Sequence, residues 1–169
     1  SISNLPTRNN TSNLRLDSSL PANYGDIVLE VTHGSELSEV LVDAEVDETL
    51  AIGTVHMYAS GVSSGQNLRL ETRLFSPEGS LVSSQETAIG VLDDNFEADA
   101  CINLDQPMLW WPHGYGDQPL YRVEVDLWVD GQLHQSQVRK VGFRRVTMPE
   151  LLHFEINNVP VRLWGSNWV

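Results

Sequence analysis

The sequence is short of cysteine, of positive charge and of long apolar segments. Cys101 is the only cysteine among 169 residues, which excludes an internal disulfide and a cysteine-rich zinc site. Ten Lys and Arg stand against 23 Asp and Glu, so the cation clusters that bind nucleic acid or anionic membrane surfaces are missing. No apolar run approaches the ~20 residues that a membrane-spanning helix needs. These absences leave an acidic globular protein of about one domain, with neither nucleic acid nor membrane as a partner.

The acidity belongs to the first hundred residues. Residues 1–100 carry 16 acidic side chains and four arginines, whereas residues 101–169 carry seven acidic and six basic ones. All five tryptophans lie in this second part. We interpret the acidic part as a solvated surface, and the alternative, electrostatic exclusion of anionic ligands, stays open at this point. The balanced, tryptophan-rich part is the one that we expect to face other domains.

Alternation of apolar and polar residues predicts an all-β chain. Residues 121–129 place their apolar side chains on one face, and Asp130-Gly131 favours a two-residue hairpin turn before a partner strand at 132–141. Similar runs occur at residues 27–32, 54–60, 67–75, 81–91 and 95–104. No segment has sustained helical periodicity, although residues 36–50 are ambiguous. Roughly seven short strands separated by turns predict an immunoglobulin-like antiparallel β-sandwich, packed without the usual disulfide.

Composition shifts divide the chain into three parts. Residues 1–25 are rich in Ser, Asn, Thr and Pro and indicate a linker or irregular lead-in, and residues 26–149 form the predicted sandwich. Residues 150–169 contain a short strand at 152–156, a turn at Asn157-Asn158 and an apolar run at 159–164. Because the chain stops soon after this run without a polar tail, we expect residues 150–169 to be a hairpin and the start of a further domain.

The densest aromatic segment is PMLWWPHGYGDQPLY at residues 107–121. Proline and glycine hold a loop without regular hydrogen bonding, and the aromatic rings offer large areas for contact. One interpretation makes Trp110, Trp111 and Tyr115 a platform on which sugar rings stack. The other makes this segment an ordered loop packed against a neighbouring domain, which we favour.

The same segment carries a resemblance to a known family. LWWPHGYGDQPLY, followed by a hairpin and by VGFRRV at 141–146, resembles the immunoglobulin-like domain of glycoside hydrolase family 2. LHFEINNVPVRLWGSNWV resembles that family's entry into its (β/α)8 barrel, although Asn158 stands where the family often has glycine. The pairing with GSNW looks most like the β-mannosidases of the family, with exo-β-glucosaminidases as the alternative. The specific match covers residues 107–169, and residues 27–106 agree only in strand pattern.

The resemblance implies a retaining hydrolysis that uses two glutamates, a nucleophile and a general acid/base, without metal or cofactor. In the family both glutamates lie on later barrel strands, so no catalytic residue is expected in this chain, and Glu150 and Glu155 are not candidates. The expected partners are a preceding sugar-binding domain, a following catalytic barrel of the same parent chain, and a carbohydrate substrate. The chain itself is then a structural domain, inactive alone; a free carbohydrate-binding sandwich remains the alternative from another class.

Two groups of residues are candidates for binding. If residues 161–165 form the first barrel strand, Asn167 and Trp168 lie at its carboxyl end, where barrel enzymes bind substrate, although Trp168 packing inside the barrel is equally open. The candidate domain-interface residues are Trp110, Trp111, His113, Tyr115 and Arg144. Arg144 and Arg145 are expected on opposite faces of a strand, so that one of them reaches across a domain boundary.

The remaining candidates for chemistry carry no site. The five histidines show no ligand spacing, so no metal site is predicted. Cys101 lies in a predicted strand without a neighbouring base, and we expect it to be a small core residue.

Overall fold

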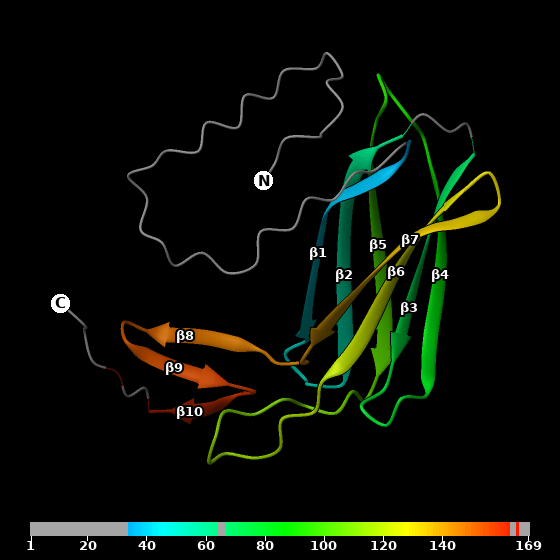
Figure 1. Cartoon of the computed structure of the whole chain (residues 1–169). Helices are drawn as coiled ribbons and strands as arrows, with labels where there is room; N and C mark the ends of the chain where they lie inside the picture. The colour runs from blue at the N-terminus through cyan, green and yellow to red at the C-terminus, as the bar shows by residue number, and fades with distance from the viewer. Residues whose placement is uncertain (1–33, 64–66, 163–164, 166–169) are drawn as a thin grey trace, which may run out of the picture. The chain divides into compact units, whose positions relative to one another are not determined.

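The computed structural model describes residues 34–63, 67–162 and 165. In these residues the regular secondary structure consists of strands. They are β1 (Glu36–Val46), β2 (Ile52–Val62), β3 (Leu68–Phe75), β4 (Leu81–Ile89), β5 (Asn95–Asp105), β6 (Tyr121–Val129), β7 (Gln132–Val141), β8 (Val146–Glu150), β9 (His153–Ile156) and β10 (Val159–Val161). All the pairings between these strands are antiparallel (Figure 1).

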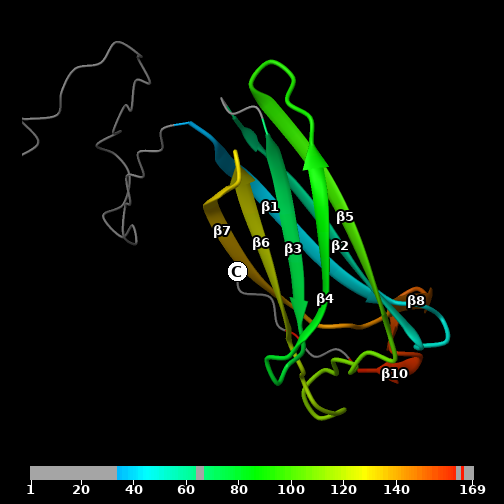
Figure 2. The same cartoon turned by 90° about the vertical axis from the view of Figure 1, so that its right-hand side faces the viewer.

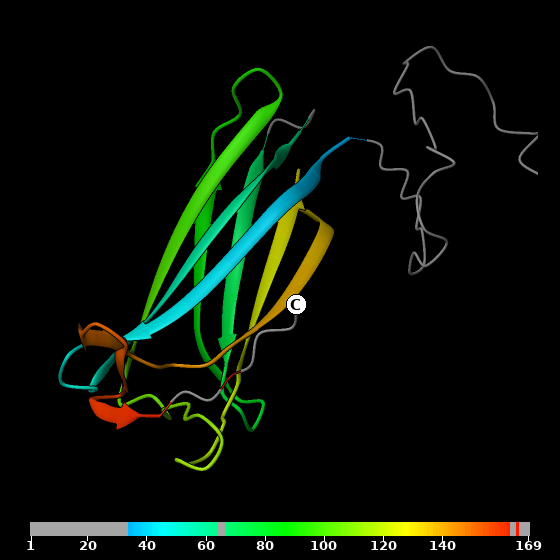
Figure 3. The ribbon, with the colours of Figure 1, turned by 90° about the vertical axis from the view of Figure 1, so that its left-hand side faces the viewer.

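Two sheets form a sandwich. One has the order β1-β2-β5 and is seen in front in Figure 3. The other has the order β4-β3-β6-β7 and is seen in front in Figure 2. The chain passes from the first sheet to the second between β2 and β3, returns between β4 and β5, and crosses again between β5 and β6. This last crossing is the aromatic loop, which therefore lies at one end of the sandwich.

The core lies between the two sheets, because each strand turns alternate side chains inward. In β3 and β6 the inward positions include Leu70, Leu74, Val123 and Leu127, which are all completely buried. Phe143, which follows β7, is also fully buried, and its ring meets the Tyr121 ring edge-on at a centroid distance of 4.8 Å. Dense apolar packing thus stabilises this sandwich in place of a disulfide.

The third sheet has the order β10-β9-β8 and follows the sandwich in the chain. It is built from short strands, and β8 is interrupted by an irregularity between Thr147 and Glu150. A two-residue turn, Asn157-Asn158, joins β9 to β10, and both residues have positive φ, 51° and 63°. The predicted hairpin at this position is therefore present and is extended to three strands by β8.

The strongest local prediction is confirmed to the residue. β6 and β7 have the predicted bounds, and Asp130 and Gly131 form their two-residue turn with φ of 48° and 80°. The ambiguous segment at residues 36–50 is strand β1 up to Val46. The predicted strand at 27–32 lies outside the described residues, as do residues 163 and 164 of the predicted barrel strand at 161–165, whose first residue, Val161, ends β10.

Two local predictions are wrong. Cys101 is exposed, because the alternation of β5 sends Ala100 and Ile102 into the core and turns Cys101 to the outer face. Arg144 and Arg145 do not lie within a strand; they belong to the connection between β7 and β8, where Arg144 forms an isolated bridge with Glu45.

Candidate functional site

The aromatic loop between β5 and β6 is anchored at its base by the core. The Tyr121 hydroxyl accepts a hydrogen bond from the Met108 N–H at 3.0 Å, and Pro107 is buried. Leu109 forms a bridge with Phe143, and the Trp110 N–H donates to the Phe143 carbonyl at 2.8 Å. The loop is thus tied to the segment that follows β7, and its path is set by the buried Tyr121 and Phe143.

Trp110 is half-buried and has contacts on several sides. Its indole packs on the backbone of Gly142, where an added Cβ would come within 2.9 Å of the Trp110 side chain. The Arg144 guanidinium lies 5.0 Å from the centre of the Trp110 ring, within the range of a cation–π interaction. The Asn157 side-chain amide donates to the Trp110 carbonyl at 3.0 Å. Trp110 therefore joins the sandwich to the β8–β10 sheet.

Trp111 and Tyr115 shape the tip of the loop. The Trp111 N–H donates to the Asp117 carbonyl at 2.9 Å, and the indole packs on Gly116, whose added Cβ would lie 2.9 Å from the ring. The Tyr115 side chain is 43% exposed, and its hydroxyl accepts from the Arg162 N–H at 3.1 Å. These intrachain contacts favour a packed loop over a sugar-stacking platform, because both half-buried indoles already pack against other residues of the chain.

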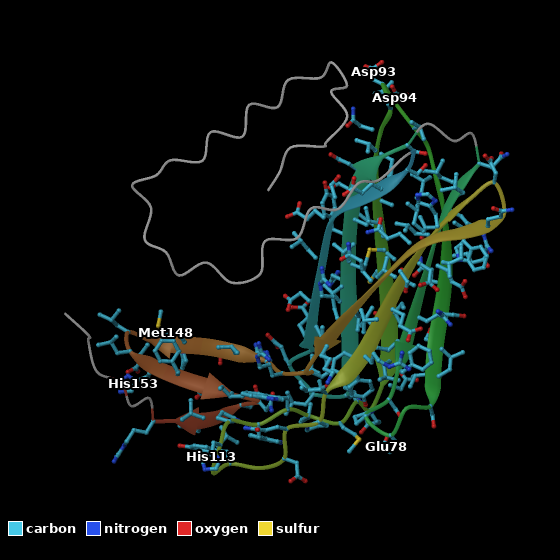
Figure 4. All side chains as sticks on the ribbon, viewed as in Figure 1. Glu78, Asp93, Asp94, His113, Met148 and His153 are labelled. Atoms are coloured by element: carbon cyan, nitrogen blue, oxygen red, sulfur yellow. The ribbon has the colours of Figure 1, made fainter. Side chains whose placement is uncertain are left out.

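The β8–β10 sheet presents apolar side chains to solvent at the same end of the molecule. Figure 4 shows Met148 and His153 on this sheet and His113 on the aromatic loop below it. Leu151 and Leu152 are 81% and 77% exposed. The other exposed apolar side chains of this sheet are Val146, Met148 and Val159. We call these five residues together with Tyr115 the apolar end surface.

An open cavity of about 1300 Å³ lies beside this surface, between the aromatic loop and the third sheet. Its lining includes Tyr115, Phe154, Glu155 and Arg162. Glu155 accepts a hydrogen bond from the Thr147 hydroxyl at 3.3 Å, and Glu150 lies 3.4 Å from His153 in an exposed pair. Tyr115 and Leu152 of the apolar end surface line this cavity. A group of exposed apolar residues beside an open cavity is typical of a surface that is covered by another part of a protein.

The β1–β2 turn completes this end of the sandwich. The Asp47 carboxylate accepts from the Thr49 hydroxyl at 2.6 Å and from the N–H groups of Ala51 and Ile52 at 2.8 and 3.0 Å. These bonds, with that of Thr49 first, hold the pKa of Asp47 below its ordinary value of 3.8. The charged carboxylate therefore organises the turn that carries Glu48.

The structure describes the predicted domain-interface residues, but the predicted substrate-binding residues lie outside its described part. It brings Trp110 and Arg144 into contact, while Trp111 and Tyr115 share the loop with His113, which is exposed. Asn167 and Trp168 lie outside the described residues. Sequence reasoning noted Asn157-Asn158 only as a turn and missed its contacts with Trp110 and Glu48, since nothing in the local pattern indicates partners 47 and 110 residues away.

Two further kinds of feature are absent from the described part of the chain. No three His, Cys, Asp or Glu side chains in it gather closely enough to hold a metal ion. No helix there is long and apolar enough to cross a bilayer.

Comparison with known proteins identifies the family. The model of the family described as Glycosyl hydrolases family 2 matches residues 35–144, more than half of the chain. The chain belongs to glycosyl hydrolase family 2. The matched residues run from the start of β1 to Arg144, so they take in the whole sandwich, and the sandwich is that of a family 2 domain.

The family 2 chain is β-mannosidase-like in sequence. β-Mannosidase B of Neosartorya fischeri is 30% identical over 155 residues, which cover 86% of this chain and 18% of that protein. β-Mannosidase B of Aspergillus niger is 44% identical over 76 residues, which cover 40% of this chain and 9% of that protein. The solved structure of a glycosyl hydrolase family 2 member from Bacteroides cellulosilyticus agrees in fold, with a TM-score of 0.67 at 19% identity, over 76% of this chain and 18% of that chain.

The matches cover most of this chain in two cases, but only a small part of each relative. This family 2 chain spans less than a fifth of the length of each of these relatives. It corresponds to a domain of a larger multidomain chain.

Proposed function

We propose that this chain is the immunoglobulin-like domain of a β-mannosidase, a retaining glycosidase that removes terminal β-D-mannosyl residues. The observation that carries the proposal is the alignment with β-mannosidase B of Neosartorya fischeri over 86% of this chain. In this proposal residues 1–25 are a lead-in, residues 26–149 a domain made of the sandwich and most of β8, and residues 150–169 the hairpin and first strand of a catalytic barrel.

The chain's own role is structural. The apolar end surface faces the catalytic barrel, and a sugar-binding domain precedes the sandwich in the parent chain. The interface residues are Trp110, Trp111, His113, Tyr115 and Arg144, all of which lie on the aromatic loop or just after β7. Asn167 and Trp168 contact the sugar at the rim of the barrel. The loop holds its shape through its bonds to Phe143 and Asn157, so it offers the barrel a preformed surface.

The catalytic glutamates lie elsewhere in the parent chain. A retaining glycosidase needs two carboxyl groups about 5 Å apart in a substrate site. Glu150, the last residue of β8, pairs with His153 in an exposed contact. Glu155, on β9, accepts a hydrogen bond from Thr147. The proposal assigns neither of them a part in catalysis, and it needs no metal or cofactor.

The test compares the 169-residue chain with its parent. The parent is expected to hydrolyse 4-nitrophenyl β-D-mannoside and to release the β-anomer of mannose first, as a double displacement requires. The isolated chain is expected to release no nitrophenol under the same conditions, because it lacks both catalytic glutamates. Turnover by the pure isolated chain would contradict this assignment.

The choice of sugar is tested in the same assay. Parent enzyme that cleaves the β-D-glucosaminide and leaves the β-D-mannoside intact would replace the proposed activity with that of an exo-β-glucosaminidase. The structural role of this chain would then stand and its substrate would change.

A further inference from the structure

The turn between β9 and β10 makes more contacts than a hairpin requires. We propose that Asn157 and Asn158 are a clamp that holds the β8–β10 sheet in one fixed orientation on the sandwich. Two-residue turns with positive φ at both positions favour glycine at the second, because a side chain there costs conformational energy. This chain keeps an asparagine at both positions, and the two side chains reach three other segments.

Asn157 is the buried half of the clamp. It is only 2% exposed, although it lies in a turn. Its side-chain oxygen accepts from the Arg145 N–H at 2.9 Å, and its amide nitrogen donates to the Trp110 carbonyl at 3.0 Å. Its own N–H donates to the Arg145 carbonyl at 2.9 Å. One residue thus joins the third sheet to the connection after β7 and to the aromatic loop.

Asn158 is the exposed half. Its amide nitrogen donates to the Glu48 carbonyl at 2.9 Å, across 110 residues of sequence. Its side-chain oxygen accepts from the Arg145 guanidinium at 3.2 Å, and the same guanidinium lies 3.3 Å from the Glu48 carboxylate. Asn158, Arg145 and Glu48 therefore form a closed triangle that joins the hairpin turn to the β1–β2 turn.

The directions of these bonds distinguish a clamp from a stabilised turn. Neither side-chain amide bonds to β9 or β10, the strands that the turn connects. They bond instead to the β1–β2 turn, to the β5–β6 loop and to the connection after β7, all of which belong to the sandwich end. Attachment to three separate segments opposes rotation of the third sheet as well as its separation from the sandwich. The turn that Asn158 contacts is itself held by Asp47.

The consequence concerns the orientation of the apolar end surface. Because β8–β10 carries most of that surface, the clamp sets the angle at which the sandwich presents it. This consequence for the parent enzyme rests on the proposed function, whereas the clamp itself is a property of the 169-residue chain and is measured there without any activity.

The test uses residual dipolar couplings of the ¹⁵N-labelled chain, which report the relative orientation of its parts. One alignment tensor is expected to fit the amides of both sandwich sheets and of β8–β10. Asn158→Gly removes the exposed triangle but keeps a residue that readily adopts positive φ. In this variant, and in Asn157→Gly, we expect the single-tensor fit to be lost, with the sandwich and β8–β10 each still fitted by its own tensor.

The matched control is Asp130→Gly in another two-residue turn with positive φ at both positions, the one between β6 and β7. Asp130 also has positive φ, and among the described residues its carboxylate accepts hydrogen bonds from the backbone and the side chain of Asn67. One tensor should still fit this variant. The proposal is overturned if the unmodified chain needs two tensors, if Asn158→Gly keeps one, or if Asp130→Gly separates the two parts as well. Should Asn157→Gly fail to fold, Asn158→Gly decides, since it removes only exposed bonds.

Discussion

Asp126 shows how one side chain can be buried on the outer face of a sheet. It points away from the core between Val125 and Leu127, yet its exposed fraction is 2%. The Arg73 guanidinium lies 2.5 Å from one carboxylate oxygen of Asp126 and 2.9 Å from Glu124. The second Asp126 oxygen is buried with no hydrogen-bond partner among the described residues. The pairing with Arg73 is therefore what makes this buried charge tolerable.

We expect Asp126→Ala to lower the free energy of unfolding by about 2 kcal/mol, because it leaves the partly buried Arg73 with weaker partners. Glu86→Ala is the matched control: Glu86 pairs with Arg69 on the same face but is 63% exposed. Its loss should cost less than about 1 kcal/mol. Urea titration of the three proteins measures both values, and equal losses in the two variants would refute the special role of Asp126.

At the scale of elements, the β1–β2 turn is a polar unit that depends on one charge. Asp47 accepts from Thr49, Ala51 and Ile52, and these bonds lower its pKa below 3.8. A carboxyl group whose pKa is lower in the folded chain stabilises that chain above its unfolded pKa. The contribution is lost as the pH falls through the folded value, below 3.8.

Comparison of the unmodified chain with Asp47→Asn tests this. At about pH 6 the variant should melt at a lower temperature, because the ionised carboxylate accepts hydrogen bonds more strongly than an amide does. The difference should shrink as the pH is lowered below 3.8, where Asp47 becomes protonated. Thermal unfolding followed by circular dichroism, at about pH 6 and at a pH below 3.8, measures the difference in melting temperature. A difference independent of pH would show that the charge of Asp47 has no such role.

At the scale of the whole molecule, two of the most exposed apolar side chains lie together at one end. Leu151 and Leu152 of the apolar end surface are more exposed than any other large apolar side chain described except Leu92, which is 78% exposed in the β4–β5 connection. Figure 4 places that connection, labelled by Asp93 and Asp94, at the opposite end from Met148 and His153. The two ends therefore offer a test of which surface is covered in the parent enzyme.

The double variant Leu151→Ser/Leu152→Ser should leave the melting temperature of the isolated chain nearly unchanged, since both side chains already face solvent. In the parent enzyme the same change should lower the melting temperature by several degrees, because apolar area buried against the barrel is lost. Leu92→Ser is the control and should be neutral in both proteins. Differential scanning calorimetry measures all six, and a parent unaffected by the double variant would exclude these leucines from the interface.

Prediction from sequence succeeded where local signals agreed. The β6–β7 hairpin has strict alternation and an Asp-Gly turn, and both strands have their predicted bounds. β1 was ambiguous because its apolar residues fit neither period cleanly, and its pairing with β2 decides its conformation. Cys101 was misplaced because alternation specifies two faces without saying which one meets the core. Of the candidate site, the aromatic loop is found from its composition. Arg145 is noted in the sequence only as one of two adjacent cations, and Glu48 gives no local signal.

Strand content, family and acidity follow from the amino-acid sequence alone, because each of them depends on local patterns or on composition. The sequence also located the loop that meets the third sheet. The tertiary structure alone decided that Asp126 is buried, that Cys101 is exposed, and that Asn157 and Asn158 reach Trp110 and Glu48. These outcomes depend on which distant strands pair and in which register, and a contact between residues 110 positions apart exists only after the chain has folded.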